Sequence, residues 1–316
     1  MRIFKKTNDV GKSSGIASFS DVRYWQTMTV QEQDIAIGNL QVSLGKVYRH
    51  VRTCSYEAYG TNKSLRIPTF KHVPTGIEFN LIMGGGYNMG FSVQEEEAML
   101  TIDQDAFFTK EVLPPPKIVQ VRPFLMSRLP VLDGLARKLL DVDPNLFRPE
   151  FSRNPKDRVP IYLSRGETLS LLKATGFDMP SEAQWEYAYR GLSTSLFPFG
   201  NNLPSREILG KLFLDVFNNQ DQCLEAANPF GLLGMYIGEW CQDSFYSDRN
   251  AKHPCSDDQP ACNGSPYVVR GGASSIWPWQ SGNEWIACMS AARWNSGTLE
   301  DGTCGVRLVK RIEIEA

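Results

Sequence analysis

The spacing of apolar residues near the start of the chain predicts one amphipathic helix. Within residues 29–51 the apolar positions recur every three or four residues, at Leu40, Leu44, Val47 and Val51, which is the period of one helix face. Because such a stripe must pack against something, we expect it to dock on the rest of the chain or on a partner. The small, polar residues 11–20 predict a loop or arm ahead of this helix.

From His72 onward the pattern changes to short alternating stretches separated by glycine and proline. Residues 76–83 predict a strand, and the three glycines at 84–86 predict a bulge or tight turn where backbone approaches backbone. A further strand is predicted over residues 118–126, after a rigid spacer of three prolines. The change of pattern divides the chain into an N-terminal extension with one amphipathic helix, residues 1–70, and a domain over residues 71–316.

Two short helices are predicted from their end signals. Ser164 followed by Glu167 forms a capping box, and Gly176 marks the end of that helix. Ser181 followed by Gln184 forms a second capping box, and Gly191 ends the second helix. The chain is read as short helices, short strands and much irregular chain, with no alternation of strand and helix and no repeat, which argues against a doubly wound sheet or a solenoid.

Composition narrows the classes of function. The formal net charge is −2 and the basic residues are dispersed, so we expect no nucleic-acid partner. No apolar run approaches the roughly 20 residues of a membrane helix, so we expect no membrane partner. The seven cysteines are odd in number and irregularly spaced, a pattern typical of reduced thiols in a cytoplasmic protein.

Five stretches of the chain, in this order, resemble motifs of the formylglycine-generating-enzyme family, also called sulfatase-modifying factors. They lie at residues 79–90, 121–131, 179–201, 228–240 and 269–308. The third is the most specific, and reads Pro-Ser-Glu-Ala-Gln-Trp-Glu-Tyr-Ala-Tyr-Arg-Gly over residues 180–191. The resemblance implies a loop-rich α+β fold with a short antiparallel sheet and few short helices, related to the C-type lectin fold. The short helices, short strands and irregular chain predicted above agree with it.

The resemblance does not extend to the catalytic cysteines. Members that make formylglycine carry a closely spaced cysteine pair after a Gly-Gly-Ser turn, and the two thiolates hold copper. Here the turn reads Gly271-Gly272-Ala273-Ser274, Ile276 or a neighbour stands at the first cysteine position, and the second falls near Ser281. Neither side chain can replace a copper-binding thiolate, so we expect neither copper nor formylglycine formation, and we assign no catalytic residue.

Other metal sites find little support in the sequence. Cys288 and Cys304 would need the fold to bring them together to act as a substitute pair, and the three histidines lie far apart. Calcium is the one cofactor left open, because Glu239 stands where the family places a ligand carboxylate, although the residues beside it differ. Asp215, Asn218, Asn219 and Asp221 offer further oxygens without a regular spacing.

Five motif residues are predicted to be structural. In a loop-rich domain, buried polar groups need dedicated partners. We expect that role for Trp185, Arg190, Trp240, Arg293 and Arg307.

Four of the seven tryptophans fall within residues 274–303, interleaved with short polar side chains. Aromatic rings beside adaptable polar groups are typical of recognition surfaces. The predicted ligand-binding residues are Trp277, Trp279, Gln280, Asn283, Trp285, Trp294 and Asn295. The alternative is that these rings fill the space left by a lost active site.

Three functions therefore compete. The first is a binding module that presents this C-terminal surface to a protein or a small molecule. By resemblance, residues 276–308 are similar in place and texture to the display region of variable proteins diversified by retroelements. The second is an oxidoreductase of the same family with a non-standard metal site. The third is a scaffold subunit whose N-terminal helix docks a partner.

Overall fold

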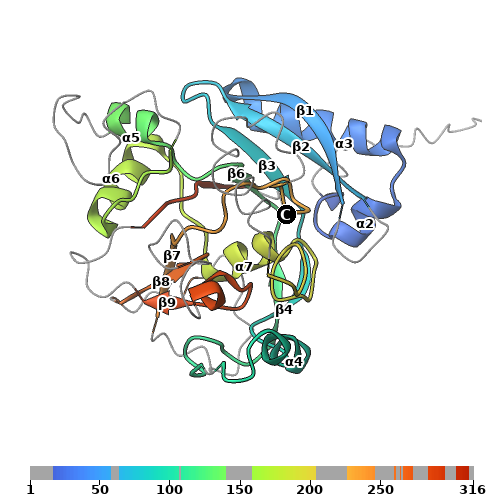
Figure 1. Ribbon diagram of the computed structural model, residues 1–316. Helices are drawn as coiled ribbons and strands as arrows, with labels where there is room; N and C mark the ends of the chain where they lie inside the picture. Colours follow the sequence, from blue (N-terminus) through green and yellow to red (C-terminus); the bar gives the residue numbers. More distant parts are fainter. Residues whose placement is uncertain are drawn as a thin grey trace, which may run out of the picture.

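A computed structural model describes residues 17–57, 64–106, 108–139, 159–203, 226–245, 260, 264, 266–272, 284–295 and 304–312 (Figure 1). Three antiparallel sheets organise this part of the chain. The largest has the strand order β1 (Tyr48–Glu57), β2 (Ser64–His72), β3 (Glu78–Ile82), β6 (Phe124–Ser127) and β10 (Val309–Arg311). The second pairs β4 (Gly85–Met89) with β5 (Lys117–Val121), and the third joins β7 (Glu239–Ser244), β8 (Tyr267–Arg270) and β9 (Trp294–Asn295).

Helices surround these sheets. Among the described residues they are α2 (Val22–Thr27), α3 (Val30–Leu44), α4 (Val93–Ile102), α5 (Asp133–Leu139), α6 (Arg165–Thr175) and α7 (Glu182–Arg190), with 3-10 turns η1 (Gly45–Val47) and η4 (Glu284–Cys288). Short helices and short antiparallel sheets make the fold mixed α+β, as the sequence predicted.

The N-terminal helix is shorter than its apolar spacing suggested. A capping box between Thr29 and Glu32 begins α3, and Gly45 ends it with a φ of 67°. Tyr48 then starts β1, so Val51, predicted on the helix face, lies in a strand paired with β2. The helical spacing was misleading there because strand pairing with distant residues overrides a local pattern. The short helix α2 also precedes α3, so the extension holds more than the one helix expected.

The described residues before position 71 share one sheet and one core with the described residues that follow. The predicted boundary after residue 70 falls inside β2, which pairs with β1 on one side and with β3 on the other. Trp25 and Leu40 belong to the same buried cluster as Phe79 and Leu308. The Trp25 Nε1 atom also donates to the Arg66 carbonyl at 2.9 Å. The apolar stripe of α3 therefore docks on its own chain.

The glycine run at residues 84–86 is a point of close backbone approach, as predicted. A Cβ atom on Gly84 would lie 2.6 Å from the Ser20 carbonyl oxygen and 2.7 Å from that of Val121. Any side chain there would clash with backbone, which cannot easily move. Glycine thus lets the N-terminal segment and β5 meet at the start of β4.

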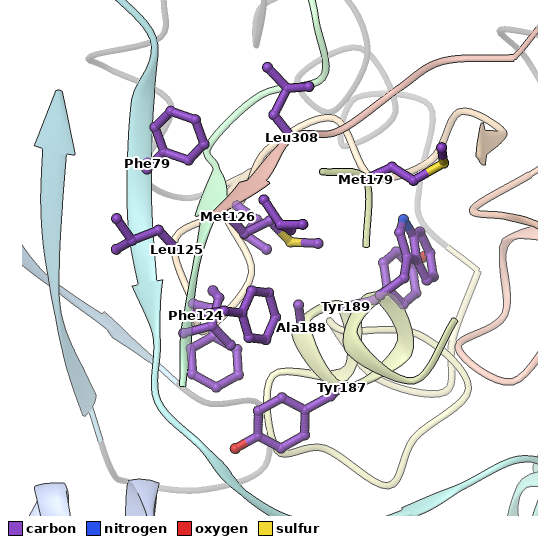
Figure 2. Packing of buried hydrophobic residues seen from close by; sticks show 14 of the residues in the cluster. Phe79, Phe124, Leu125, Met126, Met179, Tyr187, Ala188, Tyr189 and Leu308 are labelled. Carbon is purple, nitrogen blue, oxygen red and sulfur yellow. The ribbon is translucent and has the colours of Figure 1, made fainter. Parts of the chain in front are cut away.

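Helix α7 lies at the centre of the molecule and organises the candidate site. Ser181 and Gln184 form the predicted capping box, and Gly191 ends the helix in the left-handed conformation. All nine of its residues are buried. Figure 2 shows Ala188 pointing toward Phe124 and Met126 of β6, within the main hydrophobic cluster. The predicted caps of α6, Ser164 with Glu167 and then Gly176, are likewise confirmed.

Candidate functional site

A buried network of ion pairs connects β8 and residues 284–295 to α7. Arg270, at the end of β8, is fully buried, and its Nη2 donates to Glu182 Oε1 at 2.6 Å and to Glu186 Oε2 at 2.7 Å. Arg293 approaches the same Glu182 oxygen, with its Nε at 3.0 Å. The two arginines thus tie β8 and the end of the 284–295 segment to one face of α7.

The network continues to α4. Arg190 donates from Nε to Glu186 and from Nη1 to Glu95, both at 2.8 Å. Burial alone would lower the pKa of Arg190, but these two carboxylates raise it overall. Burial raises the pKa of Glu95 despite the neighbouring guanidinium. Three carboxylates, of Glu95, Glu182 and Glu186, and three guanidinium groups therefore pair with one another in the interior, which makes each of them costly to remove alone.

A second buried pair joins the C-terminal strand to β7. Arg307 and Glu239 are fully buried, and Arg307 Nη2 lies 2.8 Å from Glu239 Oε1. Trp185 Nε1 donates to the other Glu239 oxygen at 2.7 Å. The Glu239 carboxylate, considered above as a calcium ligand, is therefore the acceptor for an arginine and a tryptophan. Asp215, Asn218, Asn219 and Asp221 lie outside the described residues.

The five residues predicted to be structural are all buried and hydrogen-bonded or ion-paired. Besides the contacts above, Trp240 Nε1 donates to the Leu163 carbonyl at 2.9 Å, and Arg293 Nη2 donates to that of Phe245 at 3.0 Å. Sequence reasoning missed Arg270, Glu182 and Glu186. For the glutamates a partial signal was present, because they stand four residues apart in the most specific motif and so lie on one face of the predicted helix.

Apolar residues between positions 285 and 292 of the tryptophan-rich segment belong to a hydrophobic cluster separate from the main core, whereas Trp294 packs against the main core. Trp285 is only 4% exposed, and its ring centroid lies 6.3 Å from that of Phe197. Ile286, Cys288 and Met289 are buried in the same cluster, together with Met99 and Leu113 from the α4 region. In this arrangement Trp285 fills the interior, which was the alternative to its predicted role as a ligand contact.

Other predicted ligand contacts are placed differently. Trp294 is partly exposed in β9, opposite Val269, and Asn295 beside it is exposed. Of the seven predicted residues, these two are the described ones that reach the surface. Trp277, Trp279, Gln280 and Asn283 lie outside the described residues.

The cysteines considered as a substitute pair lie in different hydrophobic clusters. Cys288 is fully buried in the cluster around Trp285, whereas Cys304 belongs to the main core and is 6% exposed. Burial raises the pKa of the Cys304 thiol to about 12. A thiol with that pKa stays protonated at neutral pH and is a poor metal ligand or nucleophile. Within the part of the chain that the structure describes, no three acidic, histidine or cysteine side chains gather as a metal site would require.

The chain matches one protein family. A family model described as "Sulfatase-modifying factor enzyme 1-like domain" matches residues 151–312, about half of the 316 residues. The chain belongs to this family. The match includes α7, Arg270 with Glu182 and Glu186, and the Arg307–Glu239 pair, whereas Glu95 of the same network precedes the matched residues.

No curated protein sequence matches this chain. Among solved structures, Treponema denticola variable protein 1 is similar with a TM-score of 0.46 and 14% sequence identity, over 83% of this chain and 100% of that chain. Within the described residues, no helix has both the length and the apolar character needed to cross a membrane.

Proposed function

We propose that this protein is a binding member of the sulfatase-modifying-factor family, which presents its C-terminal surface to a protein or small-molecule ligand and does not make formylglycine. One observation carries the proposal. The chain belongs to the family, yet it has no cysteine between Cys262 and Cys288, where the resemblance expects the catalytic pair. Cys288 and Cys304 offer no replacement, because they are buried in separate clusters.

Hydrogen bonds that hold residues 284–295 in place support the binding role. The Cys288 carbonyl accepts from the Tyr189 hydroxyl at 2.7 Å, and the Ser290 and Ala292 carbonyls accept from Arg270 Nη1 at 3.1 and 3.0 Å. Residues 284–295 are thus held by both α7 and β8. A preorganised support lowers the entropic cost of binding for the residues displayed on it.

The ligand contacts proposed are Trp277, Trp279, Gln280, Asn283, Trp294 and Asn295. Buried Trp285 is proposed to anchor residues 284–295. We further propose that residues 276–308 are a region diversified by a retroelement, on the basis of their position in the family fold and their mixture of aromatic and small polar residues. A neighbouring reverse-transcriptase gene with a template repeat matching the codons of this region would support that finer proposal, and a locus lacking both would contradict it.

Metal content and oxygen consumption separate the binding role from an oxidoreductase role. The purified protein should contain less than stoichiometric copper and iron, and should consume no oxygen with a cysteine-containing peptide after incubation with Cu(I). Stoichiometric metal together with oxygen consumption would overturn the proposal. Calcium is tested in the same samples, by a change in melting temperature when calcium is exchanged for a chelator.

Substitution at the surface tests the proposed contacts. Trp279→Ala should leave the melting temperature unchanged and weaken the bound ligand, once that ligand is identified by a screen against the intact chain. Trp240→Phe is the matched control, because Trp240 is fully buried and donates to Leu163. It should lower stability and leave affinity unchanged in the folded fraction. Loss of stability in Trp279→Ala without loss of affinity would favour the space-filling alternative.

A further inference from the structure

Both charged side chains of α3 are already engaged within the chain. Of the 15 residues of this helix, Glu32 and Asp34 carry charge. Glu32 accepts from the Thr29 amide in the capping box, and Asp34 pairs with Arg66 at 2.7 Å. The other exposed positions of α3 are uncharged, and they are Val30, Gln31, Ile35, Gly38, Asn39, Val42 and Ser43. A surface depleted of charge is typical of the core of a protein interface.

Four of these exposed residues form a straight line on α3, which we call the outer stripe. It consists of Gln31, Ile35, Gly38 and Val42, whose spacing of 4, 3 and 4 residues is the one at which two helices pack along each other. Ile35 is 65% exposed and Val42 is 80% exposed. The opposite face of α3, which includes Leu40, is buried in the main hydrophobic core. The helix therefore has a second apolar stripe that its own chain leaves in water.

Gly38, inside the outer stripe, indicates close approach of a second helix. Glycine is unfavourable within a helix. A Cβ atom at Gly38 would have nothing within 4 Å, so packing inside this chain does not require a glycine there. An antiparallel second copy of α3 would place Ile35 of each copy against Gly38 of the other. Such a contact is self-complementary, as an interface with two-fold symmetry must be.

β1 presents an open edge beside α3. It is the outermost strand of the five-stranded sheet, and among the described residues no strand pairs with its outer edge. The first part of that edge is blocked, because the Gln41 side chain accepts from the His50 amide and donates to the Tyr48 carbonyl at 2.8 Å. The register with β2 also shifts between His50 and Arg52, and is regular from there to Glu57. Because proteins block the strand edges that they do not use, an edge left open over residues 52–57 favours pairing with another strand.

One two-fold axis fits both elements. α3 runs antiparallel to β1, because Gln41 near the end of the helix contacts the first residues of the strand. Asp34, near the start of the helix, pairs with Arg66, which lies opposite Ser55 of β1. The middle of α3 therefore lies over the middle of β1. An axis through both midpoints would pair the two α3 helices and the two β1 strands at the same time.

We propose that the outer stripe of α3 and the edge of β1 over residues 52–57 form an interface with a second copy of this chain, with both elements antiparallel across a two-fold axis. This interface is independent of the function assigned to the C-terminal surface. α3 is about 22 Å long, and a contact one helix and one strand wide is small beside the roughly 1,200–2,000 Å² of a stable interface. We therefore expect micromolar affinity. β8 and β9 lie on the other side of the molecule (Figure 1), so the dimer would present two C-terminal surfaces at once.

Sedimentation equilibrium of the full chain tests the interface. From about 1 to 200 μM, the mean mass should rise from that of one chain, 35.5 kDa, toward twice that value. A single-chain mass over this whole range would overturn the proposal. Hydrogen exchange tests the strand, because pairing protects backbone amides. Peptides covering residues 52–57 should exchange at least about threefold more slowly at the highest concentration than at the lowest. A dimer without that protection would refute the pairing of β1.

Two variants locate the interface. Ile35→Arg should weaken association about tenfold or more, because it places two like charges beside the axis. Ile118→Arg is the matched control, since Ile118 is an isoleucine of β5 that is 77% exposed, and it should associate as the unaltered protein does. Gly38→Gln should raise the melting temperature, because glutamine favours a helix more than glycine does, and yet weaken association. Unchanged association in both Ile35→Arg and Gly38→Gln, with both proteins folded by circular dichroism, would overturn the assignment.

Discussion

Replacing Arg307 with methionine should destabilise the protein more than any single surface change. Methionine keeps most of the side-chain volume, so the loss reflects polar contacts rather than a large cavity. In the structure Arg307 donates from Nε and Nη2 to Glu239, from Nη1 to the Ser127 and Arg128 carbonyls at 2.9 and 3.0 Å, and from Nη2 to Leu233 at 2.9 Å. The substitution removes the guanidinium donor from all of these acceptors.

The magnitude follows from the burial of the pair. Arg307 and Glu239 are both fully buried. Removing one partner of a buried ion pair costs about 3–5 kcal/mol, because the remaining charge is left in a low-dielectric interior. Buried carbonyls that lose a donor add roughly 1–3 kcal/mol each where nothing replaces it. We therefore expect a loss of at least about 4 kcal/mol, a large part of the roughly 5–15 kcal/mol that stabilises a typical domain.

Urea unfolding followed by tryptophan fluorescence measures this loss. Arg23→Met is the control, because the Arg23 side chain is 75% exposed and pairs with Asp21 at 3.2 Å, and an exposed pair contributes about 0–1 kcal/mol. Adding Glu239→Gln to Arg307→Met should recover part of the lost stability, since it removes the stranded charge. A loss below about 1 kcal/mol in Arg307→Met would refute the buried-pair reasoning.

Two further predictions concern the interior. Trp285→Ala should lower the free energy of unfolding by about 3–5 kcal/mol, because the ring fills the hydrophobic cluster that contains Ile286, Cys288 and Met289. Trp285→Phe should recover more than half of that loss, as measured by thermal unfolding. A Trp285→Ala protein of unchanged stability would place the ring at the surface instead. Cys304 should resist alkylation by iodoacetamide at pH 8 in the folded protein, since burial raises its pKa to about 12, and should react once urea unfolds the chain. Mass spectrometry of the labelled peptides measures the reaction rates, with half-buried Cys54 as the internal comparison. Equal rates for the two thiols would contradict the prediction.

Local signals were the most reliable guide from sequence to structure. The capping boxes at Ser164 and Ser181 were predicted correctly because all their interactions fall within four residues. The glycine run at residues 84–86 was also interpreted correctly at Gly84, where a Cβ atom would meet the backbone oxygens of Ser20 and Val121. Motif order added the family and with it the α+β fold, which periodicity alone could not supply.

Interactions between distant segments were beyond the sequence. Val51 continued the helical spacing of α3, yet it lies in β1 because β2 provides a pairing partner. Arg270 was not singled out, since its role depends on Glu182 and Glu186, more than 80 residues away along the chain. Trp285 was predicted at the surface because a tryptophan beside polar residues has the same local pattern whether it is displayed or buried. Only the packing of the α4 region against Trp285 distinguishes a buried ring from a displayed one.

The position of β10 in the five-stranded sheet limits how the gene can be divided for expression. β10 pairs with β6 at residues 124–127, and Arg307 depends on the carbonyls of Ser127 and Arg128. A clone that starts at residue 151, the first position matched by the family, would omit β6 and both acceptors. Its product would carry a strand without its β6 partner and a buried guanidinium without two of its carbonyl acceptors, and both changes favour an insoluble fragment. Useful clones must therefore begin ahead of β1, in the segment that family matching leaves out.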